Sequence, residues 1–169
     1  MIISKNENWF LIENKEKNTI SFNTKKDSDI NIYSFEKNSQ NKICFDQEWE
    51  YEAYGIEVTG YDLWDNLNSW FVVKTDSKKV FLLDWKVSGF NEKVFWSIDE
   101  VDVLVVNIPE KFNNIDLVKS IIEKSSAKTV IFSWDEEKIK SKFEKLVKSE
   151  DWEKVKIWTN PDNTQFLFI

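Results

Sequence analysis

The stretch of residues 50–107 constrains the fold more than any other part of the chain. Its last strand-like run, DVLVV at residues 102–106, is apolar without alternation, which is typical of a strand covered on both faces. Two pairs of β-favouring runs precede it: 50–53 with 56–59 around a bend, and 70–75 with 80–84 around the turn residues 76–78. The order predicts two hairpins that lead into a central buried strand.

The N-terminal third predicts more strands. Residues 9–13 and 19–23 are β-favouring runs separated by a polar turn, and they predict a hairpin. Residues 29–35 alternate in polarity and residues 42–45 form a short apolar run, so two further strands are expected. We therefore expect a meander, followed after the first central hairpin by a long polar connection at residues 60–68.

After Pro109 the pattern changes to helices alternating with strands. Asn113 or Asn114 can cap a helix, Asp135 can cap a second one, and residues 129–133 predict a strand between them. The first helix is indicated by apolar residues at helical spacing: Ile115, Val118, Ile121 and Ile122. Strands at 155–158 and 165–169 close the chain, so we expect one domain over residues 1–169 with a layered α+β or α/β sandwich.

Charge and composition exclude several function classes. The net charge of -7 opposes binding to nucleic acid or to an anionic membrane surface, and the 23 basic residues form no dense run. No apolar run approaches the roughly 18 residues that span a bilayer, and the N-terminus lacks the pattern of a signal peptide. With the single Cys44 unable to form an internal disulfide, a cytoplasmic protein is expected.

The chain contains 9 Trp, only 3 Gly, and neither His nor Arg. At the usual glycine frequency of about 7%, roughly 12 would be expected in a chain of this length. Some bacteria read the codon UGA as glycine, whereas other codes read it as tryptophan or stop. One hypothesis is therefore that several Trp positions are glycines in a bacterial source with an alternative genetic code. The other is that the protein is truly rich in tryptophan.

Five segments carry a resemblance to a known family: EYEAYGIEVTG, NSWFVV, VFLLDW, IDEVDVLVVN and SIIEKSSAKTVIFS. In this order they resemble the second half of the metallo-β-lactamase superfamily, and most closely its small bacterial metal-dependent hydrolases related to the ascorbate-6-phosphate lactonases. The resemblance covers residues 43–134 and implies a shortened αββα sandwich of mixed, largely antiparallel sheets. Glycine is typical of these relatives at or near three positions that hold Trp49, Trp85 and Trp96 here.

The family binds one or two zinc or manganese ions through several histidines and a bridging aspartate. Asp84, at the end of VFLLD, matches the bridging acid, and no other ligand of the family has a counterpart. Zinc prefers imidazole nitrogen and thiolate sulfur, so no zinc or other metal cofactor is expected, and no catalytic residue is assigned. A hard cation held by the oxygens of Asp62, Asp65 and Asp84 is the alternative.

Other candidate residues have ordinary structural explanations. Cys44 lies in a strand-like run without a His partner, which favours a structural thiol over a nucleophile. Glu50 and Glu52 share one strand face, and a solvated edge explains them better than paired catalytic carboxylates. Asp99 and Asp102 flank the entry to the central strand, where turn and capping duty is usual.

These observations predict a metallo-β-lactamase-like sandwich without a metal site, in a non-catalytic role. That role is either binding a small molecule of unknown identity or assembly, and open strand edges make a homo-oligomer plausible. The alternative is a metal-dependent hydrolase of the lactonase or phosphodiesterase type that uses an oxygen-ligated ion at Asp84.

Overall fold

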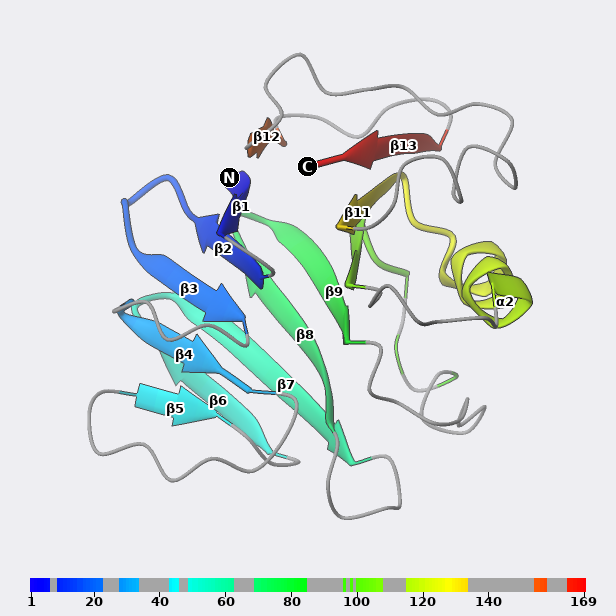
Figure 1. Cartoon of the computed structure of the whole chain (residues 1–169). Helices are drawn as coiled ribbons and strands as arrows, with labels where there is room; N and C mark the ends of the chain where they lie inside the picture. Colours follow the sequence, from blue (N-terminus) through cyan, green and yellow to red (C-terminus); the bar gives the residue numbers. More distant parts are fainter. Residues whose placement is uncertain are drawn as a thin grey trace.

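The protein is described by a computed structural model as two β-sheets that pack face to face (Figure 1). The structure describes residues 1–6, 9–22, 28–33, 43–45, 49–62, 69–84, 96, 98, 100–107, 115–133, 154–157 and 164–169. One helix of more than a turn lies within them, and it packs on part of the outer face of the larger sheet. The predicted layered sandwich is confirmed.

The first sheet has six strands in the order β12-β1-β2-β3-β4-β5. Their bounds are β1 Ile2–Asn6, β2 Trp9–Glu13, β3 Thr19–Phe22, β4 Ile30–Ile32, β5 Ile43–Phe45 and β12 Lys154–Lys156. Pairing is antiparallel from β12 to β3 and parallel from β3 through β5. The predicted meander is therefore wrong beyond β3, because the chain crosses over twice and returns in the same direction.

The second sheet has seven strands in the order β13-β11-β10-β9-β8-β7-β6. Their bounds are β6 Glu50–Ala53, β7 Ile56–Asp62, β8 Ser69–Thr75, β9 Lys78–Asp84, β10 Val103–Asn107, β11 Thr129–Ser133 and β13 Gln165–Phe168. The β6–β9 part is antiparallel, whereas β9, β10, β11 and β13 are parallel. β10 lies inside this sheet between β9 and β11, as its unbroken apolar sequence predicted.

Apolar side chains from the facing sides of both sheets form the main core. All are fully or almost fully buried, and they include Ile3, Phe10, Ile12, Ile20 and Ile30 from the first sheet and Ile56, Val58, Phe71, Val80, Val103 and Ile131 from the second. They occupy alternate positions of each strand, as a sheet with one face on the core requires.

A second core lies between the outer face of the seven-stranded sheet and helix α2 (Ile115–Ser125). Val118, Ile121 and Ile122 of the helix pack there with β10 and β11, which explains why those two strands are apolar on both faces. Ser126 follows the helix with a φ of 52°, a left-handed residue of the kind that often ends helices. The predicted first helix is confirmed, and the predicted second one lies outside the described residues.

Two tight turns set the register of the central hairpins. Tyr54-Gly55 joins β6 to β7 and Asp76-Ser77 joins β8 to β9, and all four residues have positive φ between 54° and 66°. Two-residue loops of this conformation match the natural twist of the strands that they connect. Sequence analysis placed both turns correctly, although β9 begins at Lys78, which was expected to belong to the turn.

Polar contacts join the two sheets beside the turn between β8 and β9. The Asn14 side chain donates to Thr75 Oγ1 at 3.5 Å, and the backbone N–H of Lys15 donates to the Asp76 carboxylate at 3.0 and 3.2 Å. The ammonium group of Met1 lies 3.0 Å from the same carboxylate.

Among the described residues, no helix is long and apolar enough to cross a membrane.

Candidate functional site

Polar residues end the parallel strands of the larger sheet at a common level. Asp84 at the end of β9 pairs in register with Asn107 at the end of β10, and Asn107 pairs with Ser133 at the end of β11. Because these strands run in the same direction, the three residues lie side by side at the carboxyl edge of the sheet. Ligands of open α/β sheets commonly bind outside this edge.

The row continues into the antiparallel part of the sheet. Asp62 ends β7, which runs in the same direction as β9, and it pairs with Ser69 on β8. The register of Phe71 with Leu82 places Ser69 level with Asp84. We call Asp62, Ser69, Asp84, Asn107 and Ser133 the carboxyl-edge row. Each of its five positions falls in the same alternate set of its strand as the residues that fill the inter-sheet core.

The row offers oxygen donors and few ligands of other kinds. Asp62 and Asp84 are separated by one strand, which corresponds to about 10 Å between backbone positions. Oxygen ligands of this kind suit a hard cation. Among the described residues, however, no group of three or more His, Cys, Asp or Glu side chains is arranged to hold a metal ion.

The donor set does not fit zinc. The sequence has no histidine, and Cys44 lies on β5 of the other sheet, beside Asn31 of β4. Zinc sites rely on imidazole or thiolate ligands, and a catalytic zinc needs three protein ligands and an open position. Oxygen donors from two aspartates, two serines and an asparagine do not supply that set.

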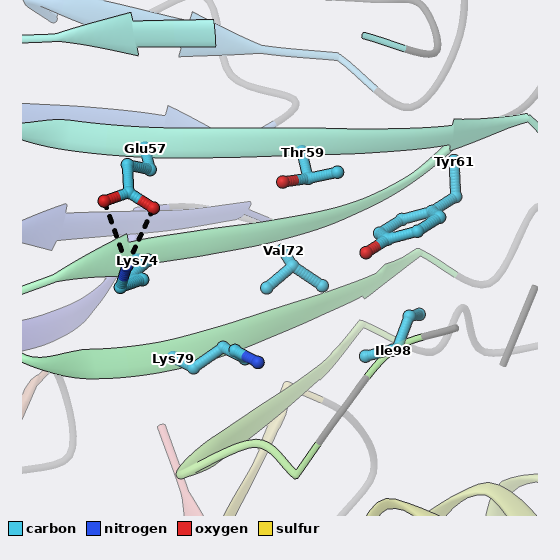
Figure 2. Close-up of a pocket in the computed structure, with 7 residues that line it drawn as sticks. All are labelled: Glu57, Thr59, Tyr61, Val72, Lys74, Lys79 and Ile98. Atoms are coloured by element: carbon cyan, nitrogen blue, oxygen red, sulfur yellow. Dashed lines mark hydrogen bonds and ion pairs between the residues drawn. The ribbon is translucent and has the colours of Figure 1, made fainter. Parts of the chain in front are cut away.

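A hollow of about 280 Å³ lies on the outer face of the same sheet, where α2 does not extend (Figure 2). β7 contributes Glu57, Thr59 and Tyr61, β8 contributes Val72 and Lys74, β9 contributes Lys79, and Ile98 closes one end. Figure 2 shows the Glu57–Lys74 ion pair at the end away from the Tyr61 ring, with oxygen–nitrogen distances of 2.9 and 3.0 Å. Val72 forms the apolar floor between them.

The hollow and the carboxyl-edge row belong to opposite faces of the sheet. Along β9, Val80 and Leu82 face the inter-sheet core, whereas Lys79 faces the hollow. Asp84 is two residues beyond Leu82, so its position belongs to the core-facing set. The hollow therefore does not contain Asp84. The row is the candidate site, since it includes the residue that the sequence singled out.

The structure places the other residues that the sequence singled out in different settings. Asp102 has the predicted structural role, because its carboxylate accepts the backbone N–H of Lys79 at 2.8 Å and contacts Lys78 Nζ at 3.4 Å. Glu50 and Glu52 are exposed on the edge strand β6, as expected for a solvated edge. Asp62 ends a strand, so the expected loop connection at residues 60–68 is wrong for its first three residues. Asp65, Trp85 and Asp99 lie outside the described residues.

Sequence analysis missed three members of the row: Ser69, Asn107 and Ser133. A signal was present, because Asn107 and Ser133 are the first polar residues after the apolar runs of β10 and β11. Placing them beside Asp84 required the parallel register of three strands that are more than twenty residues apart in sequence. Periodicity within one strand does not contain that information.

Comparison with solved structures decides the fold. A Thermotoga maritima protein, assigned to the zinc-dependent hydrolases of the metallo-β-lactamase superfamily, superposes with a TM-score of 0.77 over 99% of this chain and 97% of its own. The sequence identity is 17%. The chain has the metallo-β-lactamase fold.

Two further solved structures superpose over 73% of the chain. A diphosphatase from the PhnP family has a TM-score of 0.52, 11% identity and 70% of its own chain covered. The metallo-β-lactamase fold protein YhfI from Bacillus subtilis has a TM-score of 0.51, 8% identity and 76% covered. No protein-family model matches the sequence, and no curated protein matches it either. At these identities the likeness establishes the fold and leaves the activity open.

Proposed function

We propose that this protein is a metallo-β-lactamase-fold chain that has lost the zinc site and acts by binding a small molecule at the carboxyl edge of its larger sheet. The observation that carries the proposal is the carboxyl-edge row, in a chain without a single imidazole. Without zinc ligands there is no metal-bound water of lowered pKa, so the hydrolytic nucleophile of zinc hydrolases is missing.

The residues of the row indicate what kind of molecule would bind there. Asp62 and Asp84 are hydrogen-bond acceptors when ionised, whereas Asn107 and the two serines can both donate and accept. No Lys belongs to the row, so an anionic group would meet repulsion without compensation. The composition favours a neutral polyol or an amine over a phosphate or carboxylate.

We propose that the chain is related by descent to the ascorbate-6-phosphate lactonase-like hydrolases. The five resembling segments support it, and so does the sequence match of Asp84, which ends β9, to the bridging acid of that family. The chain is then a pseudoenzyme in a cytoplasmic setting, with the site reused for binding.

Elemental analysis together with activity assays tests the proposal. The purified protein is expected to carry no stoichiometric zinc, manganese or iron, and to leave lactone and phosphodiester panels unhydrolysed with or without added metal. A panel of polyols and amines is then screened by thermal shift. A hit should be lost in Asp84→Asn and retained in Asp116→Asn, which removes an exposed carboxylate from α2. Tightly held zinc, or hydrolysis that a chelator abolishes, would overturn the proposal.

The second candidate is a hydrolase with a hard cation at Asp84, assisted by Asp62 and Asp65. The specific observation in its favour is that Asp62 and Asp84 share one row of the sheet. Oxygen ligands suit magnesium, calcium or manganese. This candidate predicts turnover that appears with one of these ions and disappears in both Asp84→Asn and Asp62→Asn, while the binding proposal predicts no turnover in any of them.

A further inference from the structure

Four charged residues form a straight row across the outer face of the larger sheet. The register places Glu52 of β6 opposite Glu57 of β7, Glu57 opposite Lys74 of β8, and Lys74 opposite Lys79 of β9. Residues directly opposite each other in antiparallel strands share one face. We call these four residues the charge stripe; read across the strands, its signs are minus, minus, plus, plus.

The stripe groups like charges together, although a monomer would be more stable if acids and lysines alternated across the strands. Like charges directly opposite each other in a sheet destabilise it, yet here two acids are neighbours and two lysines are neighbours. Only the central Glu57–Lys74 pair joins opposite signs, and both of its side chains are more than half exposed. Asp102 lies beyond Lys79 but bonds to backbone and to Lys78, so it does not extend the stripe onto the face.

An order of minus, minus, plus, plus is complementary to its own reverse. A two-fold axis that lies between two such faces, parallel to the strands, reverses the stripe of one copy over the other. Glu52 then faces Lys79 of the second copy, Glu57 faces its Lys74, and both contacts occur twice. Two-fold interfaces are self-complementary in this way. From this charge complementarity we infer that the β6–β9 outer face is a homodimer interface.

The rest of the face agrees with a sheet-on-sheet contact. The stripe borders the hollow of about 280 Å³, whose floor is Val72 and whose far wall is Tyr61, so apolar surface lies beside the charges. Pairing through the β6 edge, in contrast, would bring Glu50 and Glu52 of two copies close together. Charged edge strands resist such pairing. We therefore expect self-association through the sheet face, and no longer through the strand edges.

The size of the face sets the strength of the dimer. β7, β8 and β9 have seven residues each, and with the four residues of β6 they present about 400 Å² of flat area at ordinary strand spacing and rise. Stable complexes bury about 800 Å² on each partner. The dimer is therefore weak, populated at high protein concentration, and sensitive to salt because its specific contacts are exposed ion pairs.

The test exchanges the signs at the two ends of the stripe and leaves the Glu57–Lys74 pair intact. Light scattering after size exclusion, at several protein concentrations in low salt, measures the dimer fraction. Glu52→Lys and Lys79→Glu should each reduce it at least tenfold, since each places two like-charged contacts in the homodimer. An equimolar mixture of the two variants should restore it, because Lys at 52 then faces Glu at 79.

The control variant carries Lys119→Glu and Lys156→Glu, which reverse two exposed charges outside the stripe, and it should dimerise like the wild type at equal protein concentration. Circular dichroism and thermal melting confirm that each variant is folded. A wild type that is monomeric at high concentration and low salt overturns the inference. So does a dimer that both single variants leave unchanged, or a mixture that fails to recover dimers from two folded, monomeric variants. None of these results bears on the carboxyl-edge row.

Discussion

Tyr54 is the first residue of the turn between β6 and β7, and its φ of 56° places a bulky side chain in the left-handed region. This conformation costs most residues about 1–2 kcal/mol, whereas Asn and Gly adopt it readily. The ring is exposed, so little packing compensates for the cost. We expect Tyr54→Asn to raise the free energy of unfolding by about 0.5–1 kcal/mol, measured by urea denaturation.

Tyr54→Phe is the matched control, because it keeps the ring and the backbone requirement and should leave the urea midpoint unchanged. A Tyr54→Asn protein no more stable than Tyr54→Phe would show that the turn is unstrained. The neighbouring Gly55 has a φ of 66° and open space around it, so Gly55→Ala should lose stability through the backbone alone.

The surroundings of the tryptophans bear on the hypothesis that UGA codons at some of these positions encode glycine. Trp49 and Trp96 are 64% and 74% exposed, which is unusual for a side chain whose burial contributes so much to folding, while Trp70 is fully buried with its ring 5.5 Å from that of Phe81. Neither Trp49 nor Trp96 has a positive φ, so the backbone tolerates glycine at both positions without requiring it.

We predict that the gene carries UGA at Trp49, Trp85 and Trp96, and that protein isolated from its natural host is lighter than the printed sequence by the difference between Trp and Gly at each. Intact-mass spectrometry with peptide mapping measures this directly. UGG codons at these three positions would refute it.

At the scale of single residues, sequence reasoning placed Asp84 at the end of a strand and gave Asp102 a structural role, because each stands next to an apolar strand. It missed Ser69, Asn107 and Ser133, whose places in the row follow from the register between strands. Short polar residues carry no chemical signature of their own. Their grouping follows from strand pairing, which a single sequence does not reveal.

Helix α2 is the element whose packing is easiest to test. Ile121 is 1% exposed in the core between this helix and the sheet, and Lys119 is an exposed residue of the same helix. Ile121→Ala should lower the free energy of unfolding by roughly 2–4 kcal/mol, from lost burial and the cavity left behind. Lys119→Ala should change it by less than about 0.5 kcal/mol.

Urea denaturation followed by circular dichroism measures both changes. If Ile121→Ala is no worse than Lys119→Ala, then α2 does not pack on the outer face of the sheet as described. Since the carboxyl-edge row lies on the other face, a ligand of that row should bind the folded Ile121→Ala protein as it binds the wild type.

At the scale of elements, periodicity was sufficient where each element packs in the ordinary way. The apolar face of α2 and the unbroken run of β10 were visible in the sequence, because each reflects burial. β1 was missed: its IISKN sequence has one buried position, Ile3, and owes its strand conformation to pairing with β2 and β12. The parallel pairing of β3 with β4 was missed for the same reason, since a short strand does not record its partner's direction.

The sandwich has two different ends: one where side chains join the two sheets, which we call the tied end, and one that holds the carboxyl-edge row. Asn14, Thr75 and Asp76 join the two sheets beside the β8–β9 turn, whereas the carboxyl-edge row lies at the other end of those strands. Seven residues of strand separate the two ends by about 20 Å. Residues at the tied end should therefore control stability without altering binding at the row.

Asn14→Ala tests this division. Asn14 is 5% exposed, its Oδ1 accepts the backbone N–H of Asn18 at 2.9 Å, and its Nδ2 donates to the buried Thr75 hydroxyl. Removing the amide leaves buried polar groups without partners, so the free energy of unfolding should fall by roughly 1–3 kcal/mol. Lys17→Ala, which breaks the exposed Glu13–Lys17 pair in the same turn region, should have no measurable effect.

The deciding measurement is stability and ligand affinity in the same Asn14→Ala protein. If the two ends are independent, the urea midpoint falls while affinity for any polyol or amine identified at the row stays within twofold of the wild type. If affinity falls in parallel with stability, the row depends on how the sheets are held at their far end. The proposed binding site would then be a property of the whole sandwich, and no longer of its carboxyl edge alone.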